Sequence, residues 1–179
     1  MSIVCHRFFY GLQPPRRECA LIGVHRDAIE GAHGHVTDDR IHLTLSITED
    51  FEDYPEDLAQ TLLTIGNDTA AAPFLVSLDR LSGGSRSIAL RPSRKIRNLS
   101  DLHRKLDHGL TRRRIRRRDW SFSPHTTLAY RTGKPFQQPV TPIAWDATDF
   151  VLIHSIVGAT QHIELGRWPL IDRQGSFDF

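Results

Sequence analysis

The order of the expected secondary structure predicts an α+β fold. Hydrophobic patterns of period 2 and period 3.6 indicate, in chain order, strand, helix, strand, helix, hairpin, helix, strand and hairpin. A short strand with the pattern His-x-Thr-Leu occurs twice, at His42 and at His125. Each half of the chain therefore supplies one such strand and at least one helix. These observations predict two similar lobes of antiparallel sheet with flanking helices, related by a pseudo-twofold axis across a central cleft.

The first half of the chain is divided by Pro and Gly residues into two strands and two helices. We expect a strand over residues 3–12, a helix over 16–32, the first motif strand over 40–47, and a helix that ends between residues 67 and 72. The first helix would bury Leu21, Val24 and Ala28, and the second would bury Leu58, Leu62 and Ile65. Residues 49–57 hold six acidic side chains, which we interpret as a solvated loop rather than a metal site.

The second half begins with a hairpin and ends with another. We expect strands over residues 74–81 and 87–91, a helix over 98–114, the second motif strand over 123–131, a Pro-rich connection over 132–145, and closing strands over 148–157 and 162–168. The helix would bury Leu99, Leu102, Leu106 and Leu110, with Ser100 as its N-cap.

Composition limits the class of protein. Hydrophobic residues make up 39% and charged residues 25% of 179 residues, which favours one globular bilobal domain over residues 1–179 rather than disorder. No apolar run approaches the ~18 residues that a membrane span needs, and the N-terminus lacks the features of a signal peptide. Two cysteines are too few for a disulfide framework. We therefore expect a monomer in the cytoplasm, without a membrane partner.

Positive charge is concentrated in one segment. The net charge is only +2, yet residues 86–118 hold 13 Lys or Arg and 2 Asp. Such a basic segment could attract a polyanion. Its densest part, residues 112–118, contains six arginines. These could be a solvated helix end or could contact a nucleic acid, and the sequence leaves both interpretations open.

The two motif strands place an imidazole beside a hydroxyl. Side chains at i and i+2 share one face of a strand, so His42 lies beside Thr44, and His125 beside Thr127. The opposite, apolar faces would hold Ile41, Leu43, Leu45 and Ile47 in the first copy, and Leu128 and Tyr130 in the second. A single motif of this kind arises easily by chance, but two copies in strands of the same polarity indicate a two-sided catalytic cleft.

This arrangement suits displacement at phosphorus. In-line attack needs a base on one side and an acid on the other, and histidine, with a pKa of about 6.5, can serve as either near pH 7. The hydroxyls of Thr44 and Thr127 could donate hydrogen bonds to the non-bridging oxygens. No metal or cofactor is required, and no other histidine has partners at metal-ligand spacing. His162 could line the cleft, but we assign it no role.

The two motifs and the first strand resemble the 2H phosphoesterases, and in particular their 2′-5′ RNA ligase group, also described as RNA 2′,3′-cyclic phosphodiesterases. The resemblance rests on Arg7-Phe8-Phe9-Tyr10-Gly11-Leu12, Ile41-His42-Leu43-Thr44-Leu45 and Phe122-Ser123-Pro124-His125-Thr126-Thr127-Leu128-Ala129. Members commonly carry Arg directly after Leu-Ala, whereas here Tyr130 intervenes and Arg131 follows.

The resemblance implies a function and roles for the site residues. An RNA or nucleotide with a 2′,3′-cyclic phosphate end would be opened to a 2′-phosphate, with His42 as general acid and His125 as general base. Thr44, Thr127 and Arg131 would bind the substrate. The residues themselves do not show which histidine takes which role. Three alternatives stay open: a phosphodiesterase for 2′-5′ linked oligonucleotides or cyclic nucleotide-sugar phosphates, a non-catalytic RNA-end binding module, and a ligase that runs the reverse reaction.

Overall fold

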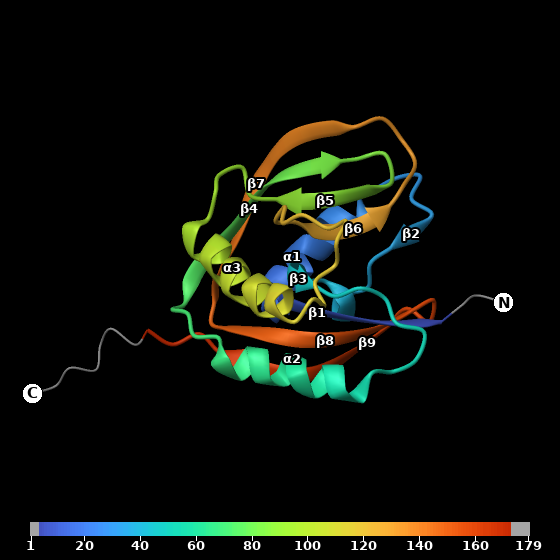
Figure 1. Ribbon diagram of the computed structural model, residues 1–179. Coiled ribbons are helices and arrows are strands. Elements are labelled where there is room, and N and C mark those ends of the chain that lie inside the picture. The colour runs from blue at the N-terminus through green and yellow to red at the C-terminus, as the bar shows by residue number, and fades with distance from the viewer. Residues whose placement is uncertain (1–3, 173–179) are drawn as a thin grey trace, which may run out of the picture.

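A computed structural model describes residues 4–172 of the chain. It consists of three α-helices, a short 3-10 helix and nine strands that form one antiparallel sheet (Figure 1). The strands are β1 (Cys5–Leu12), β2 (Gly34–His35), β3 (Leu43–Ile47), β4 (Phe74–Gly83), β5 (Ser87–Arg91), β6 (Thr126–Tyr130), β7 (Phe136–Ala147), β8 (Asp149–Val157) and β9 (Gln161–Pro169). The helices are α1 (Arg16–Asp27), η1 (Asp38–Arg40), α2 (Glu56–Asp68) and α3 (Arg97–Arg112). The predicted α+β class is therefore confirmed.

The sheet has two four-stranded lobes that meet at a narrow junction. Its strand order is β7-β4-β5-β6-β3-β1-β8-β9, and β2 pairs with β6 outside this path. Only one residue pair, Leu43 with Thr126, joins β3 to β6, whereas every other neighbouring pair on this path shares at least four. The two motif strands therefore lie side by side where the lobes meet (Figure 1).

The lobes do not coincide with the two halves of the sequence. One lobe combines β1 and β3 with the C-terminal strands β8 and β9, because β1 pairs along most of its length with β8. The other lobe contains β4, β5, β6 and β7, and α1 packs against β6 and β7. The two halves of the sequence therefore do not each form one lobe, although each lobe carries one motif strand.

The predicted Pro-rich connection is in fact strand β7. Pro139 and Pro142 lack the N–H that a central strand needs, but β7 is an edge strand, where one side of the backbone forms no ladder. It pairs with β4 from Phe74–Ala147 to Gly83–Phe136, with an irregularity between Leu78 and Arg80. Edge strands of this kind are where prolines are tolerated.

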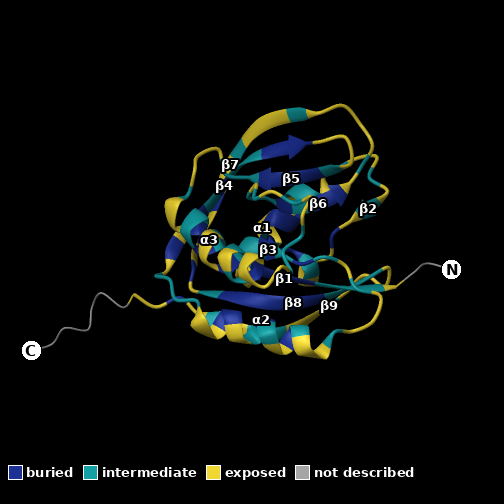
Figure 2. Cartoon of the chain, in the orientation of Figure 1, coloured by how far each residue is buried: buried dark blue, intermediate teal, exposed yellow. Residues whose placement is uncertain are grey.

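The buried residues of the three α-helices agree with the prediction for α3 and α2 but not for α1. The predicted stripe of α3 is confirmed, because Leu99, Leu102, Leu106 and Leu110 are all fully buried. In α2, Leu62 and Ile65 are buried and Leu58 is partly buried. In α1 the prediction is wrong: Leu21 and Val24 are exposed, and Ile22 and Gly23 are buried instead. Figure 2 shows exposed residues along the outer faces of α2 and α3.

The start of α3 also differs from the prediction. Ser100 lies inside the helix, and its Oγ donates to the carbonyl of Ile96, which is the N-cap residue. No side chain caps this end. Ser100 therefore has no capping role. In the described part of the chain, no helix is long and apolar enough to cross a membrane.

Gly66 sets the distance between α2 and the edge strand β9. A Cβ atom at this position would lie 2.3 Å from Cζ2 of Trp168, whose indole nitrogen donates to Asn67 Oδ1 at 2.7 Å. We expect Gly66→Ala to lower the free energy of unfolding by about 1–3 kcal/mol, because the extra methyl group displaces an anchored ring. Urea denaturation measures this change.

Gly23 in α1 provides the matched control. A Cβ atom there would lie 3.3 Å from Nη2 of Arg26, a milder approach at the far end of a side chain whose Nε and Nη1 are hydrogen-bonded. Gly23→Ala should therefore leave stability unchanged or raise it by up to about 1 kcal/mol, since Ala favours a helix over Gly. A Gly66→Ala protein at least as stable as the parent would contradict the prediction.

Candidate active site

A small pocket lies where the two lobes meet. It has a volume of about 180 Å³ and draws on both motif strands, with His42 and Thr44 from the first copy and Thr127 from the second. Three of the four predicted motif residues therefore line one cavity. His125 does not itself line it. It directly precedes β6, whose pairing with β3 brings it to the same junction.

The pairing of β3 with β6 explains this convergence. Leu43 lies opposite Thr126, and both are fully buried. Their neighbours on the other face are the motif residues, so His42 falls across from Thr127 and Thr44 across from His125. The two imidazoles then occupy diagonal corners, as expected for a pseudo-twofold axis through the junction.

Each motif strand contains a bulge at the leucine of His-x-Thr-Leu. Thr44 pairs with Gly11 but Ser46 pairs with Tyr10, so Leu45 is the extra residue. In β6, Thr127 pairs with Ala89 but Ala129 pairs with Ile88, so Leu128 is the extra residue. A bulge of one residue interrupts the alternation of side chains between the two faces of a strand.

The bulges correct the predicted faces of both strands. Ile47 and Tyr130 were expected on the apolar face, yet both line the pocket. They occupy the same offset from His42 and from His125, respectively, just beyond each bulge. Ser46 and Ala129, next to the extra residue, are buried instead. Both copies of the sequence motif therefore contain a β-bulge at the same position. The residue types alone do not predict these bulges.

Both histidines are held by the same hydrogen bond. Nδ1 of His42 donates to the carbonyl of Arg40 at 2.7 Å, and Nδ1 of His125 donates to the carbonyl of Ser123 at 2.7 Å. In each case the acceptor is two residues upstream. Because a carbonyl can only accept, the neutral rings carry their proton on Nδ1 and leave Nε2 free. Each ring can therefore give or take a proton at Nε2.

Burial makes both rings weak bases in the free protein. Desolvation is the main cause that lowers the pKa of His42, to about 4, and the backbone hydrogen bond from Arg40 opposes it only in part. Desolvation also lowers the pKa of His125, and the positive charge of Arg91 adds to the effect. Both rings are therefore neutral at pH 7 until something negative enters the site.

Two aromatic rings of the first lobe surround His42. Phe9 of β1 stacks on it with ring centroids 4.4 Å apart, and His162 of β9 meets it edge-on at 5.4 Å. Burial, together with the charge of Arg40, lowers the pKa of His162 to about 4. His162 lines the pocket. No role is predicted for it from the sequence, where the only signal is its place in a closing strand.

Two arginines supply positive charge to the pocket. Arg7 is bound by Asp50 through Nε at 2.5 Å and Nη2 at 2.6 Å. Arg40 also lines the pocket, and its Nε is buried without a hydrogen-bond partner among the described residues. A buried donor of this kind is unfavourable unless an acceptor meets it. Arg40 is therefore suited to an anion in the pocket.

Arg131 lies elsewhere. Its guanidinium carbon sits 5.5 Å from the centroid of the Phe136 ring, and its backbone N–H donates to Arg86. It is not among the residues that line the pocket, where Tyr130 is present instead, with 44% of its surface exposed. A role for Arg131 in substrate binding stays a prediction.

Two of the six arginine side chains in the run at residues 112–118 pair with acidic groups. Nε of Arg116 donates to both oxygens of Asp107 at 2.8 and 2.9 Å, and Arg117 pairs with Asp50 at 3.0 Å. The backbone N–H of Arg118 donates to Glu49 at 2.9 Å. Part of the acidic loop is therefore neutralised within the fold.

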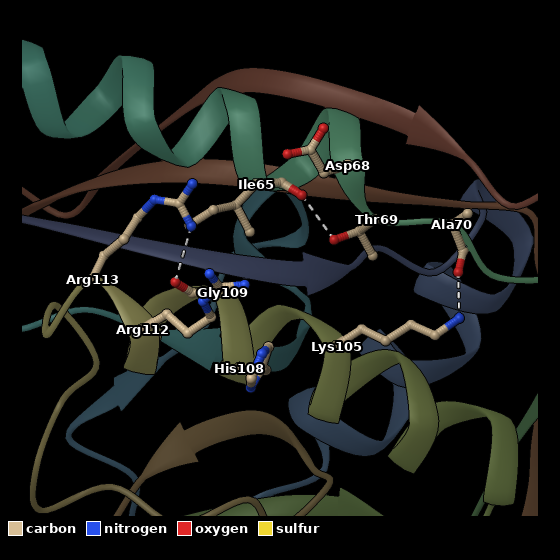
Figure 3. A pocket seen from close by; sticks show the side chains of 9 residues that line it. All are labelled: Ile65, Asp68, Thr69, Ala70, Lys105, His108, Gly109, Arg112 and Arg113. Atoms are coloured by element: carbon tan, nitrogen blue, oxygen red, sulfur yellow. Dashed lines mark hydrogen bonds between the residues drawn. The ribbon is translucent and has the colours of Figure 1, made fainter.

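Another hollow of about 620 Å³ lies between α2 and α3 (Figure 3). Lys105 Nζ donates to the carbonyl of Ala70 at 2.5 Å, and Arg113 donates to that of Gly109 at 3.4 Å. His108 is the one imidazole among the residues that line it, so this hollow does not bring two histidines together. Within residues 4–172, no cluster of His, Cys, Asp or Glu could hold a metal ion.

Comparison with solved structures shows the same fold. E. coli LigT complexed with 3′-AMP superimposes with a TM-score of 0.78 at 24% identity, over 94% of this chain and 99% of that one. The apo form of E. coli LigT gives 0.75 at 25% identity over the same shares. TT0787 of Thermus thermophilus gives 0.76 at 23% identity, over 93% of this chain and 99% of that one. A search of curated proteins gives no match.

A family profile accounts for most of the sequence. Residues 14–156, which include both motif strands and all three α-helices, match the 2′-5′ RNA ligase superfamily. This match agrees with the resemblance noted from the motifs and with the two-lobed sheet. The chain therefore belongs to the 2′-5′ RNA ligase superfamily of 2H phosphoesterases.

Proposed function

We propose that the chain is a metal-independent hydrolase that opens RNA 2′,3′-cyclic phosphate ends to 2′-phosphates. The observation that carries the proposal is the pair of imidazoles that directly precede the adjacent strands β3 and β6, each with Nδ1 donating to a carbonyl and Nε2 free. Binding alone would need neither an acid nor a base. The nucleotides present in structures of E. coli LigT, 3′-AMP, NADP+ and ATP, support a nucleotide ligand for this chain as well.

The proposed reaction is an in-line displacement between the two histidines. His125 Nε2 removes a proton from water as the water attacks phosphorus. His42 Nε2 protonates the ester oxygen as its bond to phosphorus breaks. This assignment of roles follows the family resemblance. After one turnover, His125 holds the proton that His42 has lost, and exchange with solvent restores both.

The remaining pocket groups would stabilise the charge on the phosphate. The hydroxyls of Thr44 and Thr127 flank the diagonal between the imidazoles and can donate to the non-bridging oxygens. The unpartnered Nε of Arg40 can do the same from the first lobe. Negative charge in the pocket would also raise the pKa of His42 and so allow it to carry the proton that the leaving oxygen needs.

Loss of either imidazole should abolish most of the activity. We expect His42→Ala and His125→Ala each to lower kcat on a nucleoside 2′,3′-cyclic monophosphate by about 10²–10⁴-fold, because each removes one proton-transfer group. His108→Ala, at an exposed histidine of α3, is the control and should act like the parent. EDTA should have no effect. Near-normal turnover in both motif variants would refute the proposal.

The pH dependence should differ between kcat/KM and kcat. Since burial lowers the pKa of both His42 and His125, the bell-shaped profile of kcat/KM, which reports the free enzyme, should reach its maximum below pH ~6.5. The profile of kcat should lie at higher pH, because bound phosphate stabilises the imidazolium form. Coincident profiles would show that substrate charge does not tune these rings. Initial rates from pH ~4 to ~9 measure both.

A further inference from the structure

A basic groove adjoins the second motif. It is formed by residues 91–97 between β5 and α3, by the first two turns of α3 and by residues 122–124, and we call it the β5–α3 groove. Its volume is about 810 Å³. The active-site pocket, at about 180 Å³, is smaller than the ~300 Å³ at which small-molecule sites begin. A nucleotide therefore has to extend beyond that pocket.

The groove carries positive charge that the fold leaves free. Five of its side chains are cationic and one is acidic, Asp101, which pairs with Arg104. Arg94, Lys95 and Arg97 are exposed and form no ion pair with any residue from 4 to 172. Such unpaired cations beside a phosphoesterase site favour a polyanionic ligand.

The groove differs from the arginine run downstream in where its charged side chains lie. Arg116 pairs with Asp107, and Arg117 shares Asp50 with Arg7. Beside the hollow of Figure 3, Lys105 and Arg113 donate to backbone carbonyls. Arg112 and Arg113 line that hollow and not the β5–α3 groove.

The wall of the groove offers aromatic surface. His103 of α3 stacks on Phe122 with centroids 3.9 Å apart and planes 8° apart, and Trp120 meets His103 edge-on at 5.9 Å. Nδ1 of His103 donates to the carbonyl of Leu45 at 2.6 Å, which anchors this pair to β3. Burial lowers the pKa of His103, so the ring is neutral at pH 7. Aromatic rings between cations are typical of surfaces that bind single strands.

Arg91 connects the groove to the catalytic strand. Its Nη1 donates to Ser123 Oγ at 2.8 Å and its Nε to Ser82 Oγ at 2.9 Å. The carbonyl of Ser123 in turn accepts the Nδ1 hydrogen bond of His125 at 2.7 Å. Ser123 therefore both lines the groove and holds the ring of His125. A ligand in the groove consequently lies next to the reacting phosphate.

We propose that the β5–α3 groove binds single-stranded RNA next to the reacting phosphate, so that the substrate is an RNA strand rather than a mononucleotide. Arg94, Lys95 and Arg97 contact backbone phosphates, and Phe122 with His103 forms a platform for a base. The proposal rests on the proposed function for the placement of the terminal phosphate. The affinity of the β5–α3 groove for RNA can be measured in a binding assay, without turnover.

The first test measures binding by fluorescence anisotropy. The probe is a labelled single-stranded octaribonucleotide with a 3′-phosphate, titrated with the full chain between about 50 and 200 mM salt. For the triple variant R94Q/K95Q/R97Q, we expect log K against log salt to be shallower by about 2, since each single-strand phosphate contact contributes about 0.7. The control R112Q/R113Q/R114Q removes the same charge and should keep the parent slope. Equal slopes in both triples would overturn the proposal.

A second test compares substrates of different length. For the parent, kcat/KM on an octanucleotide with a 2′,3′-cyclic phosphate end should exceed that on the mononucleotide by roughly tenfold or more. In R94Q/K95Q/R97Q this ratio should fall toward one, and in the control triple it should not. Turnover without any length dependence would leave the proposed function intact and overturn the groove. Salt-dependent binding through the groove without turnover would support the groove and overturn the proposed function.

The aromatic platform has its own variant. Phe122→Leu keeps an apolar side chain against the core but removes the π-face, so the fold should be retained. We expect it to weaken binding of the octaribonucleotide by roughly five- to a hundredfold and to leave binding of heparin unchanged. Heparin bound as tightly as RNA, with no loss in Phe122→Leu, would identify a non-specific anion surface and overturn the proposal.

Discussion

The whole site depends on one contact between strands, the pairing of Leu43 with Thr126. It joins two four-stranded lobes and sets the register of the motif strands to each other. Side chains alternate across a strand, so this pairing buries Leu43 and Thr126. It places the four candidate side chains, of His42, Thr44, His125 and Thr127, on the opposite face. A slip of one residue would bury the histidines and expose leucines. The register that buries the apolar side chains of the two strands is therefore also the register that assembles the site.

The bulges at Leu45 and Leu128 make that junction usable as a pocket. Without them, Ile47 and Tyr130 would point to the core, and the wall of the cavity would be missing on both sides. Their equal position in the two copies is the strongest sign of the pseudo-twofold relation. Hydrogen bonds add to it, since Arg40 and Ser123 hold Nδ1 of the two histidines in the same way.

Electrostatics in this protein are decided by which charges remain unpaired. Acidic side chains of residues 49–57 and of α3 neutralise Arg7, Arg116 and Arg117. Arg40 in the pocket and the cations of the β5–α3 groove remain available to a ligand. The buried imidazoles have a lowered pKa, so at pH 7 they add no charge to that of Arg40 and respond strongly to an incoming phosphate.

The sequence by itself determined the class of fold, the family and the residues His42, Thr44, His125 and Thr127 as candidates, because period-2 spacing and a repeated motif are local properties. The three-dimensional arrangement was needed to find that β8 and β9 pair beside β1, that β7 is an edge strand, and that Arg40 and His162 line the pocket with His42 while Arg131 does not. Chain connectivity, bulges and ion pairing depend on partners distant in sequence. For that reason the sequence could not show that Arg116 and Arg117 of the densest arginine run are ion-paired, or that Arg94, Lys95 and Arg97 line a groove.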